Sequence, residues 1–559
     1  MSSKLGLINL GQMFGEAVAL QRQGNLRDAE KAYNRILKIA PDNFDALNLL
    51  GAVKAQQGRI GEAQRLFSAA VKVQPRAPQG WANLGQALLG LKRGAEALEC
   101  LDKARALAPD DISILIQHAN TLLSLGRPGD ALAEFQQILT RDPRHLEARI
   151  NCGLAQAALG LPEQALAEFD AALALAPGHP IVQFNRGVTL LKLGRYAEAL
   201  AANDAALAAL PEHPGALLNR GRALAQLNQL DAAISSYEAL IARQKDHADA
   251  HFNLALTLLT RGDYRRGFAE YEWRWRRTGM PAPKNRGRLW LGEYPLARKT
   301  ILLHAEQGLG DTIQFARYVP QLVAAGATVV LEVPAELKPL MAVFGGAGTI
   351  IARGETPPPF DVHCPLGSLP LALGTELATV PAPIPYLAAD PTRHAKWSAR
   401  IEGLRRPRVA IAWSGNASHD NDRNRSIAFG RLTPLFDAPA AFVSVQRDLR
   451  NSDAAALAGE NRVTNIGSEL DDFSDTAAVL ALCDLVIAVD TAVVHLAGAM
   501  GRPVWVLVPF APDWRWGLTG ETTPWYPTAR LFRQTSPGYW DSVIARAAAE
   551  LKRFSAPAV

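Results

Sequence analysis

Small and aromatic residues recur with a fixed period along the first half of the chain. Alanine returns every 34 residues without a gap at Ala29, Ala63, Ala97, Ala131, Ala165, Ala199 and Ala233. In most copies an aromatic residue follows four positions later, at Tyr33, Phe67, Phe135, Phe169, Tyr237 and Tyr271. Glycine marks another phase at Gly24, Gly58, Gly126, Gly160, Gly194 and Gly262, and proline closes the copies at Pro41, Pro75, Pro109, Pro143, Pro177 and Pro211. Markers that keep one register over so many copies indicate a repeat protein.

The residue types at these positions fit stacked pairs of helices. Alanine and glycine let the two helices of a copy approach closely, the aromatic ring fills the gap to the next copy, and proline ends the second helix. The pattern resembles the tetratricopeptide repeat and runs from about residue 10 to about residue 275. We therefore predict about eight repeats in a right-handed α-solenoid, with a concave groove that is expected to bind a peptide or protein.

Asparagines on the first helices of the repeats are candidates for that binding. They are Asn48, Asn83, Asn120, Asn185, Asn219 and Asn253, and most of them share one repeat position. Because asparagine is a poor residue for a helix interior, a ladder of side-chain amides that holds the backbone of an extended polypeptide would explain their presence. A solvated polar face is the alternative interpretation.

The period of the apolar residues changes at Thr300. Short apolar runs then alternate with helical stretches: TILLH, TVVLEV and TIIA form a first series, and VAIAWS, FVSVQ, LVIAV and VWVLV form a second. This alternation predicts parallel sheets built from βαβ units. A proline-rich stretch near residues 377–391 separates the two series.

We predict four segments from this organisation. Residues 1–276 form the repeat array, and residues 277–299 form a linker that contains proline and arginine. Residues 300–390 and 391–559 form two Rossmann-like domains, the first facing the acceptor and the second binding a nucleotide sugar. Two such domains suggest a GT-B architecture with an interdomain cleft, where ligands meet the carboxyl ends of the strands.

Composition and charge exclude several classes of protein. The formal charge is only +5 over 559 residues, so nucleic acid is not an expected partner. The four cysteines lie far apart without a CxxC pair, which indicates neither a metal site nor a disulfide framework. The first residues make a poor signal peptide, and the apolar stretch 485–510 contains charged residues and a proline, so no membrane span is expected. These features predict a cytoplasmic protein.

The first candidate site follows the strand TILLH. Gly308 and Gly310 allow close approach of the backbone to a ligand, and a helix that begins near Asp311 offers free N–H groups. Asp311 could also serve only as a helix cap.

The second candidate site follows the strand VAIAWS. The loop is polar and includes Ser414, Asn416, Arg423, Arg425 and Ser426. Its arginines are suited to a diphosphate, which they bind through charge-assisted hydrogen bonds. Gln446 ends the next strand and is expected at the same edge. A solvated loop is the alternative.

The third candidate site follows the strand LVIAV. Asp490 at the strand end can accept hydrogen bonds from sugar or ribose hydroxyls, and Thr491 with the amides of the next helix can bind phosphate. His495 lies about one turn into that helix. A buried structural histidine is the alternative for this residue.

Two segments resemble the signature regions of family 9 glycosyltransferases, the heptosyltransferase-like enzymes. They are GDTIQFARYVP and DTAVVHLAGAMGRPVWVLV, within a resemblance that covers roughly residues 300 to 550. The combination with the repeats resembles bacterial proteins that join tetratricopeptide repeats to a glycosyltransferase, some of which modify flagellin. The plan is also similar to that of protein O-GlcNAc transferase.

The resemblance implies roles for individual residues. Asp311 matches the proposed general base, while Asp490, Thr491 and His495 match the segment that binds the donor's sugar and phosphates; we assign His495 a catalytic role with Asp311. Ala492 departs from the glycine of that segment. The family's phosphate-binding lysine has no evident counterpart, and Arg423 or Arg425 is expected to replace it. The donor therefore cannot be carried over as ADP-heptose.

The function expected from these observations is transfer of a sugar from a nucleotide donor to a Ser or Thr hydroxyl. The acceptor is expected to be a protein in the repeat groove, with flagellin-like subunits as one specific option. No metal and no cofactor are expected, and a homodimer is left open. Two alternatives remain: a scaffold with an inactive glycosyltransferase-like half, or a GT-B enzyme that acts as a sugar-nucleotide epimerase or hydrolase.

Overall fold

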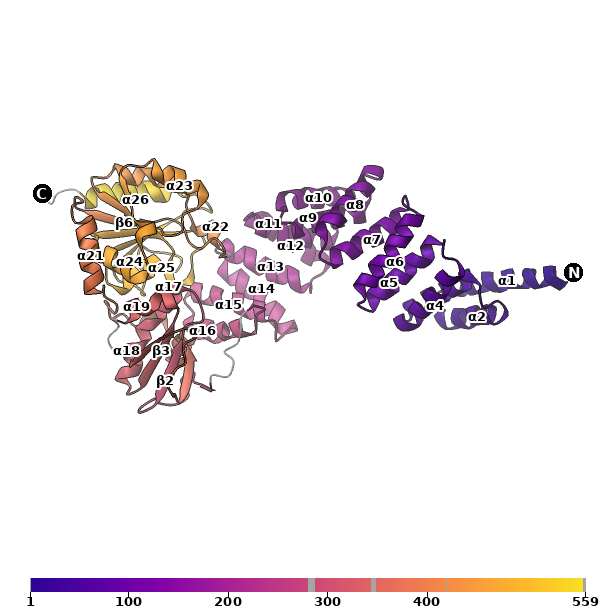
Figure 1. Ribbon diagram of the computed structural model, residues 1–559, viewed down its shortest axis with the longest axis horizontal. Helices are drawn as coiled ribbons and strands as arrows, with labels where there is room; N and C mark the ends of the chain where they lie inside the picture. The colour runs from indigo at the N-terminus through magenta and orange to yellow at the C-terminus, as the bar shows by residue number, and fades with distance from the viewer. Residues whose placement is uncertain (1, 280–286, 343–347, 420, 556–559) are drawn as a thin grey trace. The chain divides into compact units, whose positions relative to one another are not determined.

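A computed structural model describes residues 2–279, 287–342, 348–419 and 421–555 of the chain. The first half consists of paired antiparallel helices (Figure 1). Their bounds are α1 Ser2–Arg22, α2 Leu26–Ile39, α3 Phe44–Gln56, α4 Ile60–Val73, α5 Pro78–Gly90, α6 Gly94–Leu107, α7 Ile112–Ser124, α8 Pro128–Arg141, α9 Leu146–Ala158, α10 Pro162–Leu175, α11 Pro180–Lys192, α12 Tyr196–Ala209, α13 Pro214–Gln226, α14 Leu230–Arg243, α15 Ala248–Arg261 and α16 Tyr264–Tyr271. These eight pairs confirm the predicted tetratricopeptide solenoid.

The marker residues occupy the positions that their types predicted. The alanine series from Ala29 to Ala233 is fully buried, and the aromatic rings that follow it, such as Tyr33 and Phe169, are buried as well. Each marker glycine takes a positive φ in the turn between its two helices. The two gaps in the glycine series are Lys92 and Asn228, which adopt φ of 60° and 58° at the same repeat position. The turn geometry therefore persists where glycine, which adopts it without strain, is absent.

The chain divides into two compact units, residues 1–219 and 220–559. The last helices of the solenoid, α14 to α16, therefore belong to the same unit as the α/β half. The predicted domain boundaries, including the one at residue 276, stay predictions.

Two parallel sheets follow the solenoid and form the α/β region. The first sheet has the order β1-β5-β2-β3-β4, and the second has the order β11-β10-β9-β6-β7-β8. The strands are β1 Arg288–Leu289, β2 Thr300–His304, β3 Thr328–Val333, β4 Thr349–Ala352, β5 Val362–Pro365, β6 Arg408–Ala412, β7 Ala441–Ser444, β8 Val463–Asn465, β9 Leu485–Val489, β10 Val504–Val508 and β11 Ala529–Arg533. All neighbouring strands are parallel, as the βαβ pattern predicted.

Helices connect and cover these strands. The α-helices are α17 Leu309–Phe315, α18 Val319–Ala324, α19 Lys338–Met341, α20 Leu369–Ala372, α21 Pro391–Ile401, α22 Asp422–Arg425, α23 Asn451–Ala458, α24 Phe473–Leu482, α25 Ala492–Ala499 and α26 Asp541–Phe554. The 3-10 helices are η1 Glu272–Arg276, η2 Ala316–Tyr318, η3 Ala335–Leu337, η4 Leu366–Ser368, η5 Leu377–Thr379, η6 Phe429–Asp437, η7 Gly467–Glu469 and η8 Trp514–Trp516.

Both faces of the second sheet are covered, as expected for parallel strands. Residues that alternate along its strands divide between two clusters: Ala410 and Ala488 pack toward α24 and α25, whereas Ile411 and Ile487 pack toward η6 and α26. The first of these clusters continues through the first sheet to Tyr264 and Phe268 of α16. One hydrophobic core therefore joins the last repeat to both sheets.

The segment 277–299 differs from the expected linker. Residues 280–286 lie outside the described part, but Arg288 and Leu289 form β1, an edge strand that pairs with β5. Trp290 continues this edge by donating its backbone N–H to the His363 carbonyl at 2.9 Å, and its side chain is buried. A two-residue strand has no recognisable sequence period, which is why the pattern predicted only a connector.

Within residues 2–279, 287–342, 348–419 and 421–555, no helix is long and apolar enough to cross a membrane.

Candidate functional site

Two neighbouring strands of the second sheet bring the second and third candidate loops together. Because β6 and β9 pair with Ala412 opposite Ala488, Ser414 and Asp490 emerge at the same edge of the sheet. Arg425 crosses between the loops, donating from Nη1 to the Asp490 carbonyl at 3.1 Å. A Cβ at position 415 would lie 2.6 Å from Arg425 Nη2, so Gly415 provides the passage for this side chain.

Three hydrogen-bonding groups at this edge are buried without a partner among the described residues. They are the hydroxyls of Ser414 and Thr491 and the Nε of Arg425. Thr491 immediately precedes α25, but its side chain does not cap that helix. Such orphaned polar groups are uncommon in a folded protein, and a bound ligand or an ordered water would supply the missing partners.

Other predicted donor-binding residues brace the same loops. Gln446 is buried, and its Oε1 accepts the backbone N–H groups of Trp413 and Ser414, both at 3.1 Å. Its Nε2 donates to the Ser414 and Asp448 carbonyls, both at 3.1 Å. Ser426 Oγ accepts the Gly415 N–H at 3.0 Å and donates to Asp422 at 2.6 Å. The structure thus gives Gln446 and Ser426 partners within the protein.

Asn416 and Arg423 lie at the outer part of the second loop. Both are exposed. Asn416 Oδ1 accepts from Ser418 N and Oγ, both at 2.9 Å. Residue 420 of this loop lies outside the described residues. The donor-binding roles of Asn416 and Arg423 stay predictions.

The first candidate loop meets the third one through Gly310. A Cβ at this position would lie 2.7 Å from His495 Cδ2 and 3.4 Å from Ala492 Cα. Gly310 therefore lets α17 approach α25 closely, which is a packing role in addition to the ligand contact that we predicted. Gly308 precedes α17, and its N–H donates to Asp311 Oδ2 at 3.1 Å, so Asp311 does cap the helix.

His495 is held inside the protein at this contact. It is buried, its Nδ1 lies 2.9 Å from Tyr526 Oη, and its ring stacks on Trp516 with centroids 5.6 Å apart. Burial and three nearby arginines hold the pKa of His495 well below its ordinary value. A neutral imidazole with these contacts fits a residue that positions the Asp490 loop, and the catalytic role predicted for it stays a prediction.

Asp490 lies between these groups with little access to water. Its carboxylate is 3.9 Å from His495 Nε2. Burial, together with the neighbouring carboxylate of Asp513, raises the pKa of Asp490 to about 6 against the opposing effect of nearby arginines. The ionised form is therefore destabilised in the folded protein.

This raised pKa predicts a pH-dependent effect of Asp490→Asn. Between the ordinary carboxyl pKa and about pH 6 the folded state binds a proton that the unfolded chain has released, so wild-type stability rises as the pH falls through this range. The neutral variant should exceed the wild type by up to about 3 kcal/mol above pH 6, and the advantage should vanish toward pH 4. Calorimetric Tm values of both proteins from pH 4 to 8 measure this. A difference that is constant over the range would contradict the prediction.

Arg515 completes the site and was not predicted from the sequence. It lies in η8, after β10, and pairs with Asp311 of the first sheet's domain and with Asp513 at 2.9 Å. The three predicted candidate loops follow other strands, whereas Arg515 lies in the loop after VWVLV. A charged residue among tryptophans in this loop, DWRW, was the signal available.

A second missed cluster joins the last repeat to the first sheet. Arg274 of η1 is 1% exposed and contacts Glu272 at 2.6 Å, Glu306 at 3.1 Å and Ser368 Oγ at 2.7 Å. Tyr271 Oη donates to Gln307 Oε1 at 2.9 Å. Glu306 and Gln307, which these side chains contact, lie beside Asp311, so the end of the solenoid shapes the surroundings of the proposed base.

The asparagine series only partly forms a ladder. Asn83, Asn185, Asn219 and Asn253 share one register, which also includes Asn151, a residue missed in the sequence, whereas Asn48 and Asn120 are displaced from it. Asn83 Nδ2 donates to Asn48 Oδ1 at 3.0 Å, and Asn151 Nδ2 donates to Asn120 Oδ1 at 2.8 Å. Asn253 Nδ2 donates to the Asp249 carbonyl of its own helix. Several of these amides therefore link neighbouring repeats, and their binding of a peptide stays a prediction.

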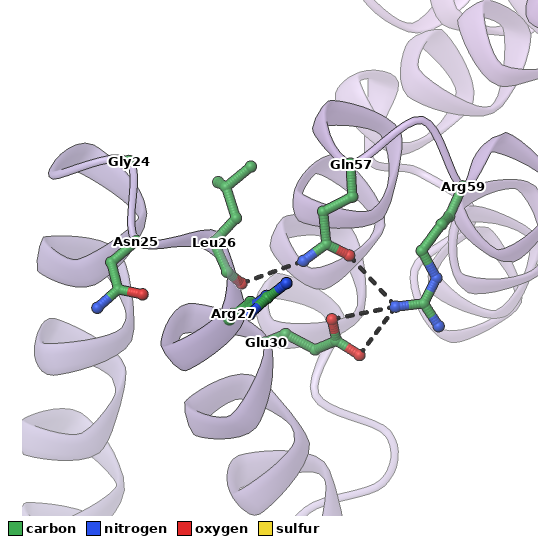
Figure 2. A pocket seen from close by; sticks show the side chains of 7 residues that line it. All are labelled: Gly24, Asn25, Leu26, Arg27, Glu30, Gln57 and Arg59. Atoms are coloured by element: carbon green, nitrogen blue, oxygen red, sulfur yellow. Dashed lines mark hydrogen bonds and ion pairs between the residues drawn. The ribbon is translucent and has the colours of Figure 1, made fainter.

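An open hollow of the first unit lies at the turns of the first two repeats. Figure 2 shows that Gln57, Arg59 and Glu30 point toward one another there. Gln57 Nε2 donates to the Leu26 carbonyl at 3.3 Å, and Arg59 Nη1 contacts Glu30 Oε2 at 3.2 Å. The residues that line this hollow include none of the predicted site residues.

Comparison with sequence families matches both halves of the chain. The tetratricopeptide repeat matches residues 14–62, 53–112, 116–180, 153–216, 184–239 and 218–277. Glycosyltransferase family 9 (heptosyltransferase) matches residues 442–541. The chain joins tetratricopeptide repeats to a family 9 glycosyltransferase domain. The matched part of this domain begins in β7 and includes Asp490 and Arg515, but it does not include Asp311 of the predicted 300–550 region.

One relative is similar over parts of both proteins. Protein FlbA of Caulobacter vibrioides (strain ATCC 19089 / CIP 103742 / CB 15) is 30% identical over 332 residues, which cover 55% of this chain and 55% of FlbA. The chain therefore aligns with about half the length of this relative.

Solved structures of repeat proteins are also similar to parts of the chain. A tetratricopeptide repeat protein from Parabacteroides merdae ATCC 43184 is 17% identical, with a TM-score of 0.38 and coverage of 44% of this chain and 98% of that one. YrrB, described as a TPR protein with an unusual peptide-binding site, is 22% identical, with a TM-score of 0.30 and coverage of 34% and 97%.

Proposed function

We propose that this protein transfers a sugar from a nucleoside-diphosphate donor to a hydroxyl of a protein acceptor. The observation that carries the proposal is the set of buried hydrogen-bond donors without a described partner, Ser414, Thr491 and Arg425, at adjoining strand ends. The two Rossmann-like sheets are proposed to act as a GT-B enzyme without a metal or a cofactor.

The donor's diphosphate fits these orphaned groups. Burying an unsatisfied polar group costs about 1–3 kcal/mol, and a ligand that supplies only acceptor oxygens removes that cost. Phosphate oxygens accept from both hydroxyls and from the Arg425 guanidinium, which also supplies positive charge. The N-terminus of α25 begins beside Thr491 and favours the same negative charge. Asp490 is then placed to accept from a sugar or ribose hydroxyl.

Asp311 is proposed to activate the acceptor. Its side chain is 26% exposed, so an acceptor hydroxyl can reach it. Asp311 takes the hydroxyl proton while the acceptor oxygen forms a bond to the anomeric carbon. The bond from that carbon to the phosphate oxygen breaks, and its electron pair leaves with the nucleoside diphosphate. General-base assistance of this kind contributes about 10²–10⁴ in rate.

The repeats are proposed to recruit the acceptor. A tetratricopeptide solenoid offers an extended protein-binding surface, which small-molecule chemistry would not need. Amides that remain available along the series, including Asn185, would contact the backbone of the bound chain. A Ser or Thr on a flagellin-like subunit is one acceptor that this proposal includes, in the cytoplasm, where nucleotide sugars are supplied.

Binding of nucleotide sugars tests the donor site. UDP-, GDP-, ADP- and CMP-linked sugars are added to the purified protein, and thermal stability is measured. One class at ten times its Kd should stabilise the protein by about 1.4 kcal/mol. Thr491→Val removes only the orphaned hydroxyl, so it should not lower the Tm of the free protein, but it should weaken donor binding about 10- to 100-fold.

Ser426→Ala is the matched control for that variant. Its hydroxyl has two partners within the protein, so its loss should lower the Tm of the free protein. The absence of a shift with every donor would favour the inactive scaffold. Binding followed by release of free sugar or of an epimerised donor, with a purified acceptor ignored, would favour the epimerase or hydrolase.

A further inference from the structure

Arg515 is the centre of an ion-pair cluster that spans both sheets' domains. Its Nη1 contacts Asp513 Oδ1 at 2.9 Å and Oδ2 at 3.1 Å, its Nη2 pairs with Asp311 Oδ1, and its Nε donates to Gln314 Oε1. The residue is 7% exposed. Asp513 and Arg515 come from the segment after β10, whereas Asp311 and Gln314 come from α17. The guanidinium is thus the direct link between the proposed base and the donor-binding half.

This link occupies the group that must take the acceptor's proton. Asp311 Oδ1 is paired with Arg515, and Oδ2 accepts the Gly308 N–H at 3.1 Å. Each oxygen has a second lone pair, but an acceptor hydroxyl that approaches Oδ1 must share that oxygen with the guanidinium. Release of Arg515 would therefore open Oδ1 to the acceptor hydroxyl.

Arg515 also lies near Asp490, the residue that precedes Thr491. The adjacent residue of η8, Trp516, stacks on His495 at the start of α25. The carboxylates of Asp490 and Asp513 both stabilise the charged guanidinium of Arg515, which burial disfavours. Arg515 in turn favours the ionised form of Asp490. Guanidinium groups form planar, paired hydrogen bonds with phosphate as readily as with carboxylate. An arriving diphosphate can therefore compete with Asp311 for Arg515.

We propose that Arg515 is a donor-binding residue that the diphosphate and Asp311 share in turn. In the free protein Arg515 is paired with Asp311. When the donor binds, Arg515 donates to the diphosphate instead, and Asp311 Oδ1 becomes available to the acceptor hydroxyl. This inference rests on the proposed function. It adds an order of events, because the base is released only after the donor has bound.

A double-mutant cycle on nucleoside-diphosphate binding tests this exchange. The Kd values of UDP, GDP, ADP and CDP are measured by calorimetry, and the nucleotide that binds the wild type is used throughout. If the diphosphate and Asp311 compete for Arg515, removing the competitor must tighten binding by reciprocity. Asp311→Asn should therefore lower the Kd about tenfold. In an Arg515→Gln background the same change should lower it about twofold or less, because only the general loss of negative charge remains.

Two further variants make the cycle specific. Glu521→Gln removes an exposed carboxylate that pairs with Arg530 at 2.9 Å in the same segment, and it should change the Kd less than about twofold. If Arg515→Gln does not fold, Arg515→Met closes the cycle. Its side chain carries no charge for either Asp311 or the diphosphate, so the gain from Asp311→Asn should again fall to about twofold.

The outcomes separate this inference from the proposed function. If the wild type binds a nucleoside diphosphate but Asp311→Asn has no effect, or the same effect in both backgrounds, the exchange at Arg515 is overturned and the donor site stands. If no nucleoside diphosphate binds the wild type, the proposed function itself is overturned, and this inference with it.

Discussion

The Asp311→Asn variant is expected to lose about 10²–10⁴ of the rate of sugar transfer while it still binds the donor. Asparagine keeps the shape of the side chain, but it carries no negative charge to hold Arg515 and cannot take up the acceptor's proton. The measurement is the initial rate of nucleoside-diphosphate release from the bound donor, with an acceptor protein or with water. Donor affinity is measured beside it, since only a loss of rate without a loss of affinity identifies a base.

An aspartate outside the site provides the control for this result. Asp448 is an exposed residue in the loop after β7, so Asp448→Asn makes the same chemical change at another strand end. Its rate should stay within about twofold of the wild type. If Asp311→Asn also stays within that range, the acceptor must be activated by another group, and Asp490 would be the next to test.

The Arg274→Met variant is expected to destabilise the second unit by about 3–5 kcal/mol. Arg274 is the buried partner of Glu306 and Glu272, and removing one member of a buried ion pair leaves an uncompensated charge. Burial already raises the pKa of Glu306, and loss of the arginine removes the main opposing effect. The deficit should therefore shrink as the pH falls, because a protonated Glu306 needs no cationic partner.

Calorimetry can assign this loss to the second unit. For a unit of this size, 3–5 kcal/mol corresponds to a Tm decrease of about 4–7 °C. Arg276→Met is the matched control: Arg276 lies two residues away, its side chain is 64% exposed, and it pairs with Asp246 at 3.3 Å. That exposed pair is worth about 1 kcal/mol or less. Equal losses from the two variants would show that Arg274 has no special role at the junction.

Much of the architecture was predictable because the signals are local and repeated. Ala29 and Tyr33 pack within their own repeat and against the neighbouring one. Because every repeat makes the same contacts, the same residue types recur every 34 residues, and the sequence alone shows this register. The parallel sheets were predictable for a related reason, since β9 and β10 are buried along their whole length and read as continuous apolar runs. The edge strand β1 was missed because two residues carry no period.

The candidate site was predictable only as far as strand ends define it. Ser414, Asp490 and Thr491 follow directly from the ends of β6 and β9, and parallel pairing brings them to one edge. The sequence could not show that the side chains of Gln446 and Ser426 hydrogen-bond to the backbone of these loops. Their partners are 33 and 11 residues away, and no sequence pattern marks a pairing at such a separation. It also could not show that Gly310 is required for the contact of α17 with His495.

By itself the sequence determined the repeats, the α/β half and the strand ends that carry the candidate site residues. Only the tertiary structure decided which charges meet. Arg515 and Asp311 are 204 residues apart, and Arg274 reaches Ser368 across 94 residues. A period or a strand end arises from neighbouring residues, whereas a buried ion pair depends on where separate elements dock. For this reason the partner of the proposed base became visible only in the folded protein.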